Sequence, residues 1–267
     1  MKWRPIAGVI LRQIYLLKGS PVRLFPMITW VAIDIVLWGF ITRYLNSIEG
    51  HGVNFVPTLL GAVLLWDFCT RIMQGISTAF LEDVWSRNFL NLFASPLSIG
   101  EYVIGLVATS MLTSALGLVV MLALATLVFG LHFLAMGVAL AAFLGILFTF
   151  GVTLGILGTA IVLRHGPASE WLLWPIPAVL APFAAVFYPL STLPAWMQVI
   201  ARCMPPAYVF GGMRQVLAGR PLPVHELGIG ALLAVGGLAL AGWTYGRVYR
   251  HAVRSGLLAR YSAEGAG

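Results

Sequence analysis

The chain has 267 residues, of which 60% are hydrophobic and only 9% are charged. Soluble globular proteins carry roughly 25% charged residues, and a chain of this size cannot bury so much apolar surface in one core. The composition excludes a soluble enzyme, a disordered protein and a disulfide-stabilised secreted domain, and it indicates a protein whose solvent is lipid. The formal net charge of +7 would suggest nucleic-acid binding in a soluble protein. Here the basic residues are first markers of membrane topology, so membrane lipid is expected as the partner and nucleic acid is not.

Residues 1–23 are predicted to form a basic amphipathic helix and not a signal peptide. Arg12 and Lys18 interrupt any apolar core that a signal sequence would need. A basic helix with an apolar stripe lies in the membrane interface, and a loosely ordered basic leader is the alternative. The stripe falls on one face at helical spacing and consists of Trp3, Ile6, Ile10, Ile14 and Leu17, with Arg12 and Lys18 turned away from it.

The hydrophobic segments that follow are predicted to form six membrane-spanning helices, because one span needs about 20 residues. Between residues 102 and 163 the sequence contains no Asp, Glu, Lys or Arg. A single helix over that run would be roughly 90 Å long, about three times the bilayer core, so the chain is expected to turn back at Gly130-Leu131-His132. The expected spans are residues 24–41, 56–81, 102–129, 133–163, 171–190 and 227–246.

The distribution of Lys and Arg predicts that both termini are cytoplasmic. Six spans place both ends on one side, and that side carries most of the basic residues near the span ends. The protein is therefore expected to be a multi-pass protein of the inner (plasma) membrane. The opposite side carries Arg43, Arg202, Arg214 and Arg220.

Three of these four arginines lie between residues 191 and 226, a segment that is too long for a simple turn. Residues 196–200 and 208–217 are compatible with two short helices, separated by Pro205-Pro206. Short helices that dip into the outer leaflet are allowed where other spans bury them, and a plain outer loop is the alternative. The fold class is thus an all-α polytopic membrane protein in one domain: an interfacial helix over 1–23, a six-helix membrane part over 24–249 and a cytoplasmic tail over 250–267.

Charged residues inside the expected spans are the first candidates for function. Asp34, Asp67 and Arg71 cost about 2.5–3.5 kcal/mol each near the bilayer centre. Asp67 and Arg71 are four residues apart, so on a helix they share a face and can pair. Two interpretations stay open: the cluster lines a substrate path, or it is a salt bridge that only holds spans together.

Prolines interrupt the expected fifth span. Each removes a backbone donor and kinks or unwinds a helix. A broken helix near the bilayer centre is typical of moving transport segments, and a permanently bent helix is the alternative. The four prolines are Pro175, Pro177, Pro182 and Pro189.

The loop after the second span is predicted to form a short amphipathic helix over residues 82–92. Acids at its start suit the helix dipole, and Pro96 stops the helix. The mixture of aromatic, aliphatic and charged residues indicates a surface that docks a protein partner, and a helix that lies on lipid is the alternative. The residues concerned are Glu82, Asp83, Trp85, Arg87, Phe89, Leu92 and Pro96.

No motif of an enzyme is present. The sequence lacks the phosphate-binding loop, the zinc-protease signature and the nucleophile elbow. The chain is therefore expected to have no catalytic residues, to bind no metal and not to be an enzyme by itself. Any reaction that drives it must come from outside the chain.

The outer segment and the loop after the second span together resemble the ABC-2 type transporter permeases, the membrane subunits of exporters for drugs, lipids, polysaccharides and nodulation factors. The loop contributes Glu82 and Arg87 followed by Pro96-Leu97-Ser98. In the outer segment the resemblance rests on Phe187-Tyr188-Pro189-Leu190-Ser191, Leu193-Pro194-Ala195-Trp196-Met197, Pro205-Pro206-Ala207-Tyr208 and Arg214.

This resemblance implies a permease that works as a dimer, or with a sister permease, on two cytoplasmic ATPase subunits that bind ATP and Mg. Residues 82–92 would act as the coupling helix on the ATPase, and the cargo would be amphipathic, lipid-linked or drug-like. The alternatives are an ion-coupled secondary transporter that uses Asp34 and Asp67, and a non-transport membrane assembly factor. The implied outer gate includes Tyr188, Pro189, Leu193, Pro194, Tyr208 and Arg214.

Overall fold

The computed structural model describes residues 3–19, 24–49, 55–86, 92 and 97–255, and over these residues the regular structure is helical. The predicted all-α fold is confirmed for this part of the chain. The long helices are α2 (Leu24–Glu49), α3 (Phe55–Trp85), α5 (Ile99–Phe129), α6 (Val138–His165) and α10 (Val224–Arg254). The shorter ones are α1 (Trp3–Gly19), α7 (Ile176–Phe183), α8 (Ala195–Arg202) and α9 (Pro205–Leu217), with 3-10 turns η2 (Phe133–Met136), η3 (Pro167–Leu172) and η4 (Leu190–Thr192).

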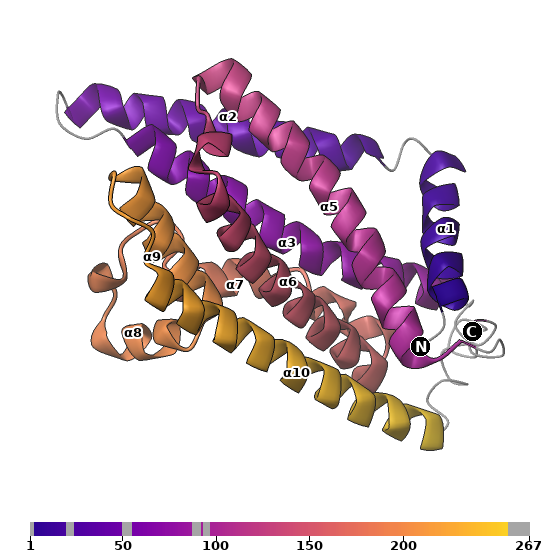
Figure 1. Cartoon of the computed structure of the whole chain (residues 1–267). Coiled ribbons are helices and arrows are strands. Elements are labelled where there is room, and N and C mark those ends of the chain that lie inside the picture. Colours follow the sequence, from indigo (N-terminus) through magenta and orange to yellow (C-terminus); the bar gives the residue numbers. More distant parts are fainter. Residues whose placement is uncertain (1–2, 20–23, 50–54, 87–91, 93–96, 256–267) are drawn as a thin grey trace.

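Helix α3 lies at the centre of the bundle, in contact with α2, α5, α6 and α9 (Figure 1). Helix α10 packs along α6. Helix α1 lies crosswise at one end, against α5, and α8 and α9 lie at the opposite end (Figure 1). We call these the α1 end and the α9 end; the last turn of α3, the first turn of α5 and the last turns of α10 all belong to the α1 end.

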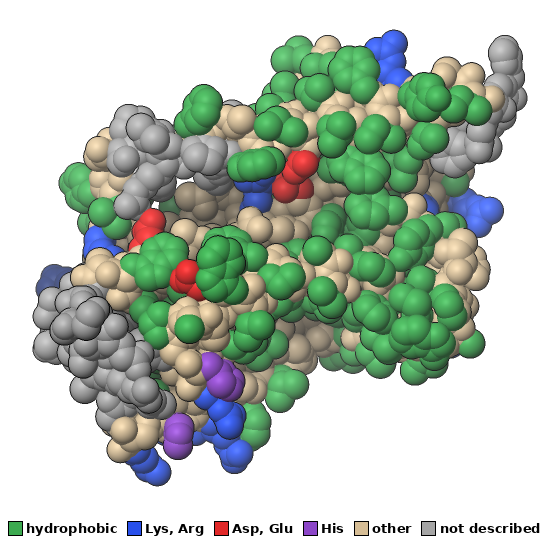
Figure 2. Space-filling view, turned by 180° about the vertical axis from the view of Figure 1, so that it is seen from behind, with side chains coloured by type: hydrophobic (Ala, Val, Ile, Leu, Met, Phe, Trp, Pro, Cys, Tyr) green, Lys and Arg blue, Asp and Glu red, His purple; other side chains and the backbone are tan. Residues whose placement is uncertain are grey.

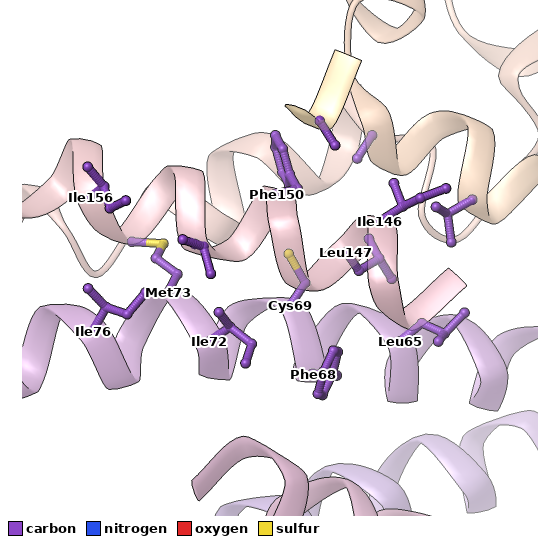
Figure 3. Close-up of a cluster of buried hydrophobic side chains, with 14 of the residues drawn as sticks. Leu65, Phe68, Cys69, Ile72, Met73, Ile76, Ile146, Leu147, Phe150 and Ile156 are labelled. Carbon is purple, nitrogen blue, oxygen red and sulfur yellow. The ribbon is translucent and has the colours of Figure 1, made fainter. Parts of the chain in front are cut away.

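The core of the bundle is the interface between α3 and α6. Leu65, Cys69 and Ile72 of α3 lie against Leu147 and Phe150 of α6 (Figure 3). Glycines make the approach this close: a Cβ at position 151 of α6 would lie 2.7 Å from a carbonyl oxygen of α3. Because apolar side chains gain no hydrophobic free energy by leaving lipid, close backbone approach and dense packing are what hold such helices together.

Four helices among the described residues are long and apolar enough to cross a membrane: Val56–Trp85, Ile99–Phe129, Val138–His165 and Val224–Arg254. They correspond to the second, third, fourth and sixth predicted spans. The predicted first span is helical as α2, which runs on to Glu49. The total of six spans stays a prediction.

The predicted fifth span, residues 171–190, is not one helix. It consists of the end of η3, a turn, the eight-residue α7 and irregular backbone up to η4. Eight residues of helix extend only about 12 Å. Pro177 lies in the first turn of α7 and Pro182 lies inside it, one residue before its end. The interruption expected from the prolines is thus confirmed, and it is more complete than a kink.

The turn predicted at residues 130–132 is confirmed. Gly130 ends α5 with φ 68°, a left-handed conformation that glycine adopts without steric cost. The two short helices predicted between residues 196 and 217 are also present, as α8 and α9. Pro205 and Pro206 do not simply break the chain there; they form the first turn of α9, where a missing N–H is harmless.

Helix α1 is present as predicted, and the face that it buries against the bundle shares Ile6 with the predicted stripe. The residues it buries are Ile6, Val9 and Gln13, whereas Trp3 of the predicted stripe is 72% exposed. Val9 packs so closely on α5 that a Cβ at Gly105 would lie 2.6 Å from it. Arg12 was expected to point away from the stripe, and its guanidinium forms an ion pair with the buried Asp83 of α3.

Candidate functional site

A buried carboxylate joins three helices at the α1 end. Asp83, in the last turn of α3, is fully buried. Its Oδ1 forms an ion pair with the guanidinium of Arg12 from α1. Its Oδ2 accepts a hydrogen bond of 2.8 Å from the hydroxyl of Tyr102 in α5, which is also fully buried. We call Arg12, Asp83 and Tyr102 the buried triad; it fixes the end of α3 to both α1 and α5.

The predicted coupling residues lie around Asp83 in the sequence, from Glu82 to Pro96. Glu82 is half-buried, and Trp85 is 53% exposed while its indole N–H donates to Oε2 of Glu170 in η3 at 2.9 Å. Leu92 is half-buried and packs on the core. Arg87, Phe89 and Pro96 lie outside the described residues.

The predicted separate helix over 82–92 therefore needs a correction at its start. Residues up to Trp85 are the final turn of α3, continuous with the second span, and Asp83 is inside the protein. The sequence pattern gave no sign of this because the acids at 82 and 83 also suit the first turn of a new helix. Further along the chain, Ser98 and Glu101 form a capping box at the start of α5.

The intramembrane charges form one cluster between α2 and α3. Arg71 Nε donates to Oδ2 of Asp67 at 2.5 Å, one helical turn away. Asp34 of α2 is close enough to Arg71 to interact with it electrostatically. Gly117 of α5 leaves room for Arg71, since a Cβ there would lie 3.2 Å from Cδ of the arginine. The structure thus brings together the three residues that the sequence singled out.

Hydrophobic side chains cover most of the face of the molecule that Figure 2 shows. In Figure 2 a few acidic and basic side chains lie together in the otherwise hydrophobic middle of the face. On the same helix as Asp34, Trp38 stacks on Phe187 with ring centroids 5.2 Å apart. Helix α2 is therefore in contact with the irregular segment after α7 one turn away from the charge cluster.

That irregular segment is held by an arginine from α9. Ala185 has φ 51°, the single described non-glycine residue with a positive φ, and it is fully buried. The guanidinium of Arg214 donates to the carbonyl oxygens of Ala185 at 2.9 Å and Val186 at 3.1 Å. Burial lowers the pKa of Arg214 to about 10, so the group still carries its charge at neutral pH. The charged donor thus satisfies two carbonyls of the irregular backbone that follows α7.

The other predicted gate residues surround this contact. The Tyr188 hydroxyl donates to the carbonyl of Pro182, and the Tyr208 hydroxyl donates to that of Arg202, each at 2.8 Å. Leu193 is buried in a small cluster with Ala185. Pro189 and Pro194 precede η4 and α8, respectively, as their N-caps. Both tyrosines thus close backbone turns that the prolines shape.

Two residues of the buried triad, Arg12 and Tyr102, were not predicted as functional. Arg12 is 71 positions from its partner, and no local pattern links them. Asp83 has Arg87 four residues further along as a local candidate partner, so the sequence carries no signal that points to the distant one. Among the described residues no group of three or more His, Cys, Asp or Glu side chains is placed to hold a metal ion.

Comparison with protein families gives one match, to the family described as ABC-2 type transporter, over residues 13–218. The matched range begins inside α1, one residue after Arg12, and ends just after α9. It includes Asp83 and Tyr102 of the buried triad, the charge cluster and Arg214. No curated protein matches the chain.

Proposed function

Because this chain belongs to the ABC-2 type transporter family, we propose that it is the permease subunit of an ATP-driven exporter whose ATPase is a separate protein. Members of this family are transport permeases, not catalytic by themselves, and they generally work with an ABC ATPase. The proposal places the α1 end in the cytoplasm of a cell whose inner membrane holds the six spans. ATP and Mg bind to two ATPase subunits, and a second copy of this chain or a sister permease completes the transporter.

The observation that carries this proposal is the buried triad. The chain that follows Trp85 is attached to α3 by a turn whose carboxylate is bonded to α1 and α5. A partner that pushes on residues 82–92 therefore moves the ends of three helices together. Close-packed protein interiors switch between discrete arrangements and do not deform continuously, so this movement is passed on to the rest of the bundle.

The path for cargo in this proposal runs beside α2, α3 and the interrupted segment around α7. Asp34, Asp67 and Arg71 supply the polar groups along it, and the contact of Arg214 with Ala185 belongs to the outer gate. Interrupted helices supply the places where a transport path opens. ATP drives this change only because the ATPase binds the two states of the permease with different affinity.

The experiment is co-purification of the full chain with an ABC ATPase co-expressed from the same genome. Trp85→Ala should weaken retention of the ATPase about thirtyfold, which corresponds to the roughly 2 kcal/mol of an interfacial tryptophan. Trp196→Ala is the matched control, because Trp196 is 62% exposed at the α9 end. Glu82→Gln tests the neighbouring acid in the same way.

Equal retention of the ATPase by Trp85→Ala, Glu82→Gln and wild type would refute the assigned coupling surface. If no ABC ATPase is retained by the wild-type chain, the proposal of a separate motor fails as well.

A further inference from the structure

A cavity of about 590 Å³ lies at the α9 end, between α9, the chain before α8 and the start of α10. Pockets for small molecules are typically 300–1,000 Å³, so this cavity exceeds what an inorganic ion needs. Part of its wall is apolar and includes Pro189, Leu190 and Ala207. The cavity therefore offers apolar surface to a ligand as well as charge.

The charge in this cavity is predominantly positive. Arg202, Arg214 and Arg220 all line it, against Glu226 alone. Arg202 and Arg220 are exposed, and within the described part of the chain neither forms an ion pair. Glu226, which accepts a hydrogen bond of 3.3 Å from the amide of Gln215, offsets one of the three arginine charges, and the lining keeps a net positive charge.

The position of these arginines requires an explanation. Arg and Lys are normally depleted on the side of a membrane protein opposite the cytoplasm, yet three of them surround one cavity there if the α1 end is cytoplasmic. Guanidinium groups bind phosphate and carboxylate with matched pairs of donors. Arg214 is already fixed by two backbone carbonyls, so it holds one wall of the cavity in place while Arg202 and Arg220 stay free to contact a ligand.

We propose that this cavity binds the phosphate-bearing headgroup of an amphipathic molecule in the outer leaflet, with the apolar part of the molecule against Pro189 and Leu190. Two sources share this chemistry: cargo on its way out and a resident anionic phospholipid. The assignment to cargo rests on the proposed export function, whereas binding of the headgroup does not.

The test measures binding of fluorescently labelled phosphatidylglycerol to the purified full chain in phosphatidylcholine nanodiscs. Arg202→Gln/Arg220→Gln is expected to weaken binding about tenfold or more, because two charge-assisted contacts are lost. Arg43→Gln removes the same kind of exposed charge, on the same predicted side but outside the cavity, and is expected to bind as wild type does. Arg214 is left unchanged because it also holds Ala185.

Equal phosphatidylglycerol binding by wild type and the double variant would overturn the proposal. So would equal binding of labelled phosphatidylcholine and phosphatidylglycerol by wild type. Inorganic phosphate and unlabelled phosphatidylglycerol are then compared as competitors of the labelled lipid. If both displace it at the same concentrations, the apolar part of the ligand contributes nothing to binding, and the proposal of an amphipathic ligand is overturned.

The complex with the ATPase separates the two sources. If phosphatidylglycerol stimulates ATP hydrolysis in wild type but not in the double variant, the ligand is cargo. If it binds and leaves hydrolysis unchanged, it is a resident lipid at the same site. Normal lipid binding by a chain that retains no ATPase would refute the proposed motor and leave the cavity site intact.

Discussion

Removing the tyrosine hydroxyl from the buried triad is predicted to destabilise the protein measurably. In Tyr102→Phe, the carboxylate of Asp83 loses the hydrogen bond from Tyr102 and keeps the ion pair with Arg12, while it stays fully buried. A hydrogen bond to a charged group contributes about 1.5–3 kcal/mol. At about 2 kcal/mol, the melting temperature should fall by about 4–8 °C for a chain of this size.

The chain contains its own reporter for this measurement. Cys69 is completely buried between α3 and α6, whereas Cys203 is exposed, and both are free thiols. In a Cys203→Ser background a thiol-reactive fluorophore therefore labels the protein only when α3 and α6 separate. Heating the detergent-purified protein with the fluorophore gives the melting temperature directly.

A double-mutant cycle with Asp83→Asn tests the reason for the loss. The asparagine keeps the shape but removes the charge, so Tyr102→Phe in that background should cost about 1 kcal/mol less than in wild type. If Tyr102→Phe lowers the melting temperature equally in both backgrounds, the hydroxyl does not act through this carboxylate. That result would refute the triad as the link between α3 and α5.

Three further predictions concern other parts of the bundle. Gly151→Ala should cost about 1–3 kcal/mol in the same melting assay, because its Cβ has no room against α3, while Gly145→Ala, which meets no atom within 4 Å, should be neutral. Ala185→Val should greatly lower the yield of folded protein, since a β-branched residue at φ 51° in a buried site is strained, whereas Ala185→Gly should fold normally. Asp34→Asn should reduce transport with an unchanged melting temperature, and Asp67→Asn should reduce both; normal transport by both variants would leave the charge cluster with a structural role only.

The sequence predicted the helices well where one physical signal decides them. Long hydrophobic runs gave the positions of α3, α5, α6 and α10, and Gly130 gave the turn between α5 and α6. The largest difference is at the end of α10, which continues to Arg254 and not to residue 246. The charge cluster was also predictable, because the i,i+4 spacing of Asp67 and Arg71 is a local property. Helices α8 and α9 were predictable because two helix-compatible segments are separated by Pro205-Pro206.

What the sequence could not predict are contacts between distant segments. Hydrophobic periodicity does not distinguish a face that contacts lipid from one that contacts protein, since both are apolar. For that reason the apolar stripe of α1 did not reveal the buried face, which combines Ile6 of the stripe with Val9 and Gln13 from outside it. The pairing of Arg12 with Asp83 has the same origin, because nothing local in either segment identifies its partner.

The most direct test of the whole account is flux of a labelled amphipathic cargo in vesicles that contain the purified chain. With the ABC ATPase and Mg-ATP present, the account predicts sustained accumulation, and with the chain alone it predicts none. Sustained accumulation by the chain alone would contradict the account, because this permease would then have a source of energy other than a separate ATPase.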